Sequence, residues 1–277
     1  MSIYSEFITR FGLLTEKNKF IVANTLSNIF TMREIGNKTH GDMAEVGIVE
    51  FINQFMYDYK SKHVGKDLYR AKEHEEDIVI TNELTKVSFP VSLKAYGDGP
   101  LQLSTDKSFV MFKELGKYGP IIKQPIISAI LSGDSFSDLF SMNLMPLIYR
   151  EKERECNILI FNFDKVLKEV CSIEYQDSGS GRKHPVYIFL DNSNEYICEV
   201  RYGGPSANAL QRGFWTNTKR AINYFTSATG GWIKYETNSY LVKLIMLALN
   251  STKKAHIEAN TVLQNSIDTL KSGKKDD

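Results

Sequence analysis

The stretch 75–96, EEDIVITNELTKVSFPVSLKAY, decides the fold, because it holds two apolar strand candidates joined by a short polar connection. The first candidate is DIVIT (77–81) and the second is VSFPVSLKAY (87–96). The connection is short enough to fold them into an antiparallel pair. Both candidates carry charge where a buried strand avoids it, because Asp77 opens the first and Lys94 lies late in the second.

Alternation along the second strand candidate separates its polar residues from its apolar ones. Ser92 and Lys94 share one face, because successive side chains of a strand point to opposite faces. The other face carries Val91, Leu93 and Ala95. If the two strands pair, Asp77 and Lys94 lie on one surface of the sheet.

A helix is predicted before these strands, in DMAEVGIVEFINQFMYDYKSK (42–62), whose apolar residues recur at helical spacing. Glu45 falls on the apolar face of this helix. If the helix packs on the surface that carries Asp77 and Lys94, two carboxylates and one amine surround a single point. Such a group can bind Mg²⁺ through oxygen ligands and hold a water for attack on a phosphate.

This order of residues resembles the PD-(D/E)xK nuclease superfamily, and within it the type II restriction endonucleases. The resemblance covers about residues 40–96: a helix with a glutamate, a strand with an aspartate, and a next strand with Ser92-Leu93-Lys94. It implies that Asp77 and Glu45 bind Mg²⁺ and that Lys94 is the catalytic lysine. Ser92 departs from the pattern, because it occupies a position that is usually acidic. The implied activity is hydrolysis of a phosphodiester in double-stranded DNA.

A second region, EVRYGGPSANALQRGFWTNTKRA (199–221), is rich in side chains that reach base edges and phosphates. It is predicted to form a strand, a Gly-Gly turn and the start of a helix, and to read DNA for the first region. The candidate DNA-binding residues are Arg201, Asn208, Gln211, Arg212, Asn217, Lys219 and Arg220. Two copies of the chain would cut the two strands of a palindrome, so a homodimer is expected.

The whole chain is predicted to be α/β or α+β, with a central mixed sheet, helices on both faces and an N-terminal helical layer over 5–34. Further strands are expected in CNILIFNF (156–163), PVYIFLD (185–191) and EYICEVRYGG (195–204). From about 206 onward the pattern favours helices again. One restriction-endonuclease-like domain over 1–277 is expected, with a possible division into a catalytic half, 1–150, and a DNA-recognition and helical half, 151–277.

Three other interpretations of the same residues stay open. Asp191 followed by Glu199 and Arg201 repeats the order of a carboxylate and a strand with a basic residue, but a guanidinium differs from an ammonium in geometry and stays protonated. A Ser92–Lys94 dyad would suit a serine hydrolase, although residues two apart on a strand lie about 6–7 Å apart. A non-catalytic DNA-binding or assembly module would explain the missing acidic residue at position 92.

Composition excludes several classes of function. The net charge is +1, so the chain lacks the overall basic character of a non-specific nucleic-acid binder. The five histidines show no zinc-ligand spacing, and no phosphate-binding glycine motif indicates a nucleotide cofactor. Three widely spaced cysteines favour reduced thiols, and no apolar run is long enough for a membrane span. A cytoplasmic protein without a membrane partner is therefore expected.

Overall fold

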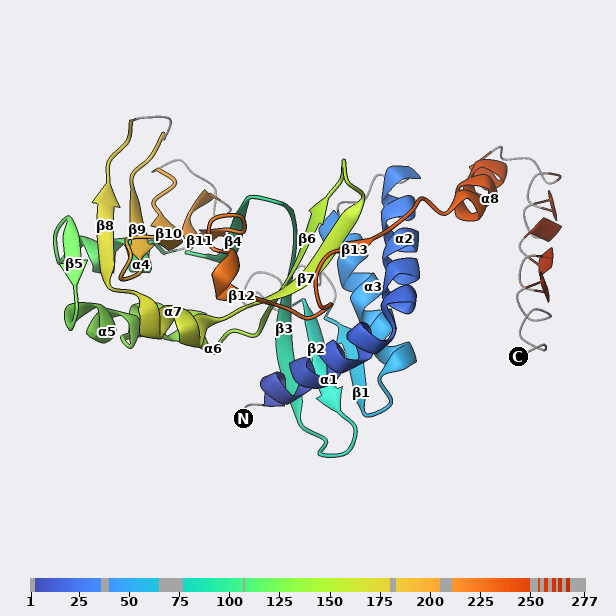
Figure 1. The fold of residues 1–277 in the computed structure, drawn as a ribbon, viewed down its shortest axis with the longest axis horizontal. Helices are drawn as coiled ribbons and strands as arrows, with labels where there is room; N and C mark the ends of the chain where they lie inside the picture. The colour runs from blue at the N-terminus through green and yellow to red at the C-terminus, as the bar shows by residue number, and fades with distance from the viewer. Residues whose placement is uncertain are drawn as a thin grey trace.

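The computed structural model has an α+β fold built on two sheets (Figure 1). This confirms the predicted fold class and the predicted mixed sheet. The second sheet was not predicted. The described residues are 3–35, 40–64, 77–106, 108–179, 183–204, 211–249, 254, 257–258, 261–262, 264–265 and 268–269.

The N-terminal helical layer is confirmed and consists of α1 (Ile3–Lys17), α2 (Lys19–Ile35) and α3 (His40–Phe55). Gly47 allows α3 to lie close to α2, because a Cβ there would stand 1.9 Å from the Cδ1 atom of Ile29. The prediction of a helix over 42–62 was wrong at its end, where residues 59–63 form a strand instead.

The mixed sheet has the order β1-β2-β3-β6-β7-β12, and β13 also pairs with β7. Only β3 and β6 run parallel, and every other pair in this sheet is antiparallel. The bounds are β1 (Tyr59–His63), β2 (Ile78–Asn82), β3 (Ser88–Gly97), β6 (Leu144–Arg150), β7 (Glu155–Phe161), β12 (Phe225–Ser227) and β13 (Ile233–Lys234).

Both faces of the mixed sheet are buried at its centre, because each strand divides its side chains between two cores. In β6, Met145 and Leu147 point to the core beneath α1–α3, whereas Leu144 and Ile148 belong to a second core. That second core lies against the other sheet and the helices α4 (Val110–Gly116), α5 (Ile126–Leu131), α6 (Asp134–Ser141) and α7 (Phe163–Glu169). The two sheets are therefore joined through continuous packing.

The second sheet has the order β4-β11-β10-β9-β8-β5 and is antiparallel throughout. Its strands are β4 (Pro100–Thr105), β11 (Gly213–Asn217), β10 (Tyr196–Arg201), β9 (Val186–Leu190), β8 (Ser172–Gln176) and β5 (Ile121–Lys123). The helix predicted from about residue 206 was therefore wrong over β11, which a 3-10 turn, η3 (Ile222–Tyr224), and β12 follow.

A helix does form at α8 (Ser239–Leu249), as the apolar run there predicted, and it packs against α2 (Figure 1). Most of the polar helix predicted near 251–271 lies outside the described residues.

Two segments pass from one sheet to the other side by side. The first joins β3 to β4 through Asp98 and Gly99, and the second follows β11 through Thr218. The backbone N–H of Thr218 donates to the Gly99 carbonyl at 2.9 Å, and the Gly99 N–H donates to the Thr218 hydroxyl at 2.9 Å. Both sheets consequently take strands from either side of residue 150.

Candidate functional site

The antiparallel pair predicted from 75–96 is confirmed as β2 and β3, and its register places Asp77 opposite Ser92. Ile78 pairs with Val91, and the Asp77 N–H donates to the Val91 carbonyl at 3.2 Å. The Asp77 Oδ2 atom accepts from the buried Ser92 hydroxyl at 3.1 Å and from the Leu93 N–H at 2.6 Å. The carboxylate thus accepts the backbone N–H of Leu93, which lies past the end of the β2–β3 pairing and has no backbone acceptor in β2.

Lys94 lies two positions after Ser92 on the same face of β3. Strand β2 begins opposite Val91, so Lys94 has no partner residue in β2. Its side chain is partly buried and makes no ion pair with any residue that the structure describes. Its neighbour in the adjacent strand β6 is Pro146. Within the described part of the chain, no carboxylate neutralises the ammonium of Lys94.

Glu45 does not join this group, which corrects its predicted place. The helix α3 packs on the face that carries Val91 and Leu93, opposite to the face of Ser92 and Lys94. Glu45 instead contacts His63 of β1, with 2.7 Å between its Oε2 atom and the imidazole Nε2 atom. The inward position of Glu45 was predicted correctly, but the face of the sheet that the helix covers was not.

The possible metal ligands on the Ser92 face are few, so they fit a Mg²⁺ ion that keeps most of its coordinated waters. Mg²⁺ in proteins is commonly held by one or two carboxylates together with substrate phosphates. Here Asp77 supplies one carboxylate, whose Oδ1 atom has no partner among the described residues, and Ser92 supplies a neutral oxygen. No cluster of three His, Cys, Asp or Glu side chains able to hold a metal occurs in the described part of the chain.

The Ser92–Lys94 dyad is not formed. The Ser92 hydroxyl is 3% exposed and donates to the carboxylate of Asp77 rather than to the amine of Lys94. A nucleophilic serine needs an open hydroxyl beside its base, so this arrangement gives no support to a serine hydrolase.

The alternative active site, Asp191 with Glu199 and Arg201, is not assembled either. Asp191 lies in the turn between β9 and β10, where it accepts the N–H groups of Ser193 and Glu195 at 2.8 and 2.9 Å. Glu199 pairs with Ile188, three positions before Asp191, which corresponds to about 10 Å along a strand. The carboxylates of Asp191 and Glu199 are therefore held in separate surroundings.

The predicted DNA-reading residues divide into stacked and exposed side chains. Arg201 binds the buried carboxylate of Glu199 at 2.5 Å and lies 4.0 Å above the ring of Trp215. Arg212 lies 4.0 Å above the ring of Phe109. Arg201 is thus engaged within the second sheet, and Arg212, just before β11, is engaged by the residue that precedes α4.

The remaining predicted readers are positioned by a tight turn after β11. The Asn217 side-chain oxygen accepts the backbone N–H groups of Lys219 and Arg220 at 3.1 and 3.2 Å. The Lys219 and Arg220 side chains are exposed, as is Gln211. Asn208 lies outside the described residues.

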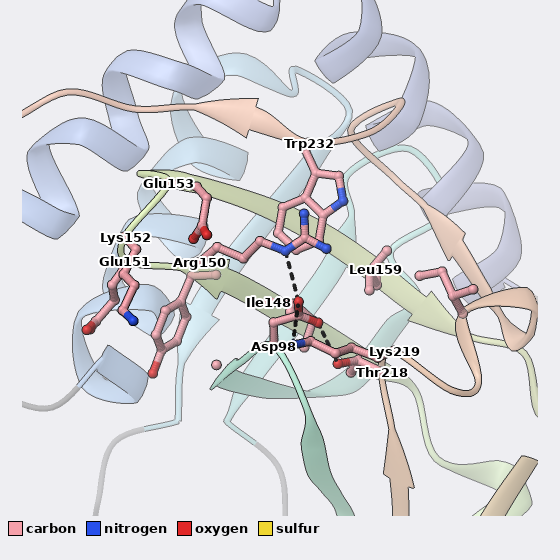
Figure 2. A pocket seen from close by; sticks show the side chains of 13 residues that line it. Asp98, Ile148, Arg150, Glu151, Lys152, Glu153, Leu159, Thr218, Lys219 and Trp232 are labelled. Carbon is pink, nitrogen blue, oxygen red and sulfur yellow. Dashed lines mark hydrogen bonds and ion pairs between the residues drawn. The ribbon is translucent and has the colours of Figure 1, made fainter. Parts of the chain in front are cut away.

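A cleft of about 950 Å³ lies where the two sheets meet (Figure 2). Of its lining residues, Lys219 alone is among the predicted DNA-binding residues, and the cleft itself was not predicted from the sequence. At its centre, the Asp98 Oδ2 atom binds the Arg150 Nε atom at 2.9 Å and the Lys219 Nζ atom at 3.6 Å. The Thr218 hydroxyl is 3.3 Å from the Asp98 Oδ1 atom. The Arg150 guanidinium stacks 3.9 Å above the ring of Trp232.

Arg150 is fixed on a second side by Glu155, which binds its Nη1 atom at 2.9 Å. Partial burial opposes the charge of Arg150, but the carboxylates of Asp98 and Glu155 outweigh it and raise the pKa of the guanidinium. The residues come from β6, β7 and the two crossing segments, so no local motif connects them. In the sequence, the turn around Asp98 and the polar segment that contains Lys219 are the signals that point to members of this group.

Comparison with known proteins gives no match, whether with family models, curated proteins or solved structures. None of the helices in the described residues is long and apolar enough to cross a membrane. The three cysteines are unpaired: Cys156 and Cys198 are buried, and Cys171 is exposed.

Proposed function

We propose that this protein is a Mg²⁺-dependent, sequence-specific endonuclease of double-stranded DNA, comparable to a type II restriction enzyme. The observation that carries the proposal is the β2–β3 register, which brings Asp77 beside Ser92 and places Lys94 on the same face, where no described residue forms an ion pair with its amine. The resemblance to the PD-(D/E)xK nucleases requires this order and this common face.

Each residue has a distinct role in the proposed reaction. Asp77 would hold Mg²⁺ through its carboxylate, whose orientation is fixed by the Ser92 hydroxyl and the Leu93 N–H. Mg²⁺, when bound, neutralises phosphate charge and favours ionisation of an attached water. Lys94 donates to a phosphate oxygen or to the attacking water, where its positive charge stabilises the developing negative charge.

Sequence recognition is assigned to the segment that follows β10. The side chains of Gln211, Lys219 and Arg220 are exposed, and the guanidinium groups of Arg201, Arg212 and Arg220 each stack on an aromatic ring. Cleavage of both strands calls for two copies of the site, so a homodimer belongs to the proposal. The unpaired cysteines favour the cytoplasm as its compartment, as expected for a restriction-modification system.

The proposal is tested by incubating the purified protein with unmethylated plasmid and phage DNA in Mg²⁺ and resolving the products on a gel. We expect discrete bands from the wild type and at least about a 100-fold lower rate from Lys94→Ala, with DNA binding retained. Lys62→Ala is the matched control, because Lys62 is an exposed lysine of β1 in the same sheet.

Undiminished cutting by Lys94→Ala would remove this lysine from the site. Equal loss of cutting in Lys62→Ala would show that a change of net charge, rather than the position of Lys94, affects the rate.

A non-catalytic DNA-binding or assembly module is the second candidate, favoured by the contacts of Asp77. Its carboxylate already accepts two hydrogen bonds from β3, which is a structural role that needs no metal. This candidate predicts salt-sensitive DNA binding that Mg²⁺ leaves unchanged, and intact DNA with every divalent metal tested.

A further inference from the structure

The cleft between the sheets faces the same side of β3 as the proposed catalytic lysine. Residues 94, 96 and 98 lie on one side of β3 and its extension, because every second side chain of a strand shares a face. Tyr96, the middle one of the three, is 44% exposed. Four residues of strand span about 13 Å, so the Asp98 end of the cleft lies about that far from Lys94. A ligand at Lys94 that extends along β3 therefore reaches the cleft.

The lining of the cleft combines fixed cations with apolar and aromatic walls. Arg150 of β6 and Lys219 of the turn after β11 converge on one oxygen of Asp98, while Ile148, Leu159 and Trp232 form part of the wall (Figure 2). The volume, about 950 Å³, is far larger than a single phosphate or sulfate needs. A ligand with both anionic and flat apolar parts fits this lining, as a nucleotide does.

The two basic residues differ in how firmly they are held. Arg150 is fixed in its plane by Asp98, Glu155 and the ring of Trp232, so little side-chain entropy is lost when it binds an anion. Lys219 is 63% exposed and 3.6 Å from its carboxylate partner, so its ammonium can turn to an outside phosphate. A third cation, Lys152, lies on the exposed rim.

The acidic residues of the cleft set the mode of binding. Asp98, Glu151 and Glu153 balance Arg150, Lys152 and Lys219, so the lining has no net charge (three negative and three positive groups). Long-range attraction of a polyanion is consequently weak, and binding depends on direct contacts with the cations.

We propose that this cleft binds a nucleotide segment of the DNA strand that is cut at Lys94, with its phosphate held by Arg150 and Lys219. At 3.4 Å of rise per nucleotide, a distance of about 13 Å corresponds to about four nucleotides from the cleaved phosphate. The inference rests on the proposed function for the identity of the strand. Lys219 thereby links the segment proposed to read DNA with the strand proposed to cut it.

The test is a titration of the full chain with a short duplex oligonucleotide in Ca²⁺, over a range of salt concentrations. We expect the double variant Lys152→Ala/Lys219→Ala to bind at least several-fold more weakly. Its plot of log affinity against log salt should be shallower by about one unit for each lysine that contacts a phosphate. Lys113→Ala/Lys123→Ala is the matched control, because it removes the same charge from exposed positions in α4 and β5.

Fluorescence locates the ligand, because the chain has two tryptophans, Trp215 and Trp232. DNA should change the emission of the Trp215→Phe variant, in which Trp232 is the remaining tryptophan, and the change seen in the wild type should be smaller in Trp232→Phe. Binding and salt dependence equal to wild type in the lysine double variant would overturn the inference. A signal that Trp232→Phe leaves intact would also overturn it.

The two proposals fail in different ways. If the wild type cuts DNA and the lysine double variant binds it normally, the cleft proposal is wrong and the nuclease proposal stands. If DNA is never cut but the double variant loses affinity and salt dependence, the cleft binds nucleic acid and the nuclease proposal is wrong. If a free nucleoside monophosphate gives the whole Trp232 signal and duplex DNA gives none, the cleft takes a small molecule and the strand assignment is wrong.

Discussion

Lys94 in β3 and Arg201 in β10 are both partly buried basic residues, each two positions after a polar residue on the same strand face. Their surroundings differ. Arg201 binds Glu199, the polar residue of its own strand, and stacks on Trp215. Ser92 instead donates to Asp77, and no described residue forms an ion pair with Lys94. The same spacing thus gives a cation neutralised within its sheet in one case and an available cation in the other.

The largest effect is expected from Leu93→Ala, which tests the face assignment on which the availability of Lys94 depends. Leu93 is 7% exposed in the core beneath α1–α3, so its truncation should lower the free energy of unfolding by about 3 kcal/mol. Lys94→Ala should change it by less than about 0.5 kcal/mol. Urea denaturation of both variants measures the difference, and similar losses would reverse the assignment of the two faces.

A smaller loss of stability is expected from Arg201→Ala. The change removes the cation at 2.5 Å from the buried Glu199 carboxylate, together with the stack on Trp215. We expect a loss of about 2 kcal/mol, below that for a fully buried pair because Arg201 is 29% exposed. Thermal unfolding of Arg201→Ala measures this loss. Lys94→Ala is the control, because it also removes one positive charge. A stability equal to that of Lys94→Ala would make the two cations equivalent.

Asp77→Ala should lower the free energy of unfolding less than Arg201→Ala does, because it removes two hydrogen bonds at the start of β2. Loss of the acceptor for Ser92 and Leu93 should cost about 1.5 kcal/mol, and Asp77→Asn, which keeps one acceptor oxygen, should cost about half of that. If Asp77 also holds Mg²⁺, both variants lose cleavage equally despite their different stabilities. Cleavage that follows stability would instead give this carboxylate a structural role alone.

Cysteine labelling should have no effect on stability and tests the two sheets separately. Burial, with a smaller contribution from the charge of Glu155, raises the pKa of Cys156 in β7 to about 12. Burial also raises the pKa of Cys198 in β10, well above its ordinary value. Because thiolates react and thiols do not, iodoacetamide at pH 8 should modify only Cys171 in the folded chain. Mass spectrometry of the labelled protein would show a second label if either sheet opens readily.

Alternation and helical spacing in the sequence predicted the β2–β3 pair, the N-terminal helices and the common face of Ser92 and Lys94. They could not show which face α3 covers, because that choice depends on tertiary packing, and Glu45 was misplaced for this reason. Polar residues over 206–221 suggested a helix, but pairing with β4 and β10 made β11 a strand.

The cleft could not be predicted, because Asp98, Arg150 and Lys219 are far apart in the sequence and meet only where the sheets join.

Both sheets contain strands from before and after residue 150, and this affects how the chain folds during its synthesis. β7 can pair with β6 as soon as it is made, but its partners on the other side are synthesised only at residues 225–227 and 233–234, and β4 must wait for β11 at 213–217. Neither sheet is complete while the ribosome is still translating the first two hundred residues, so the final pairings form late and between distant segments. Two fragments separated at 150 would each lack strands of both sheets, and we expect them to become native only when they are produced together.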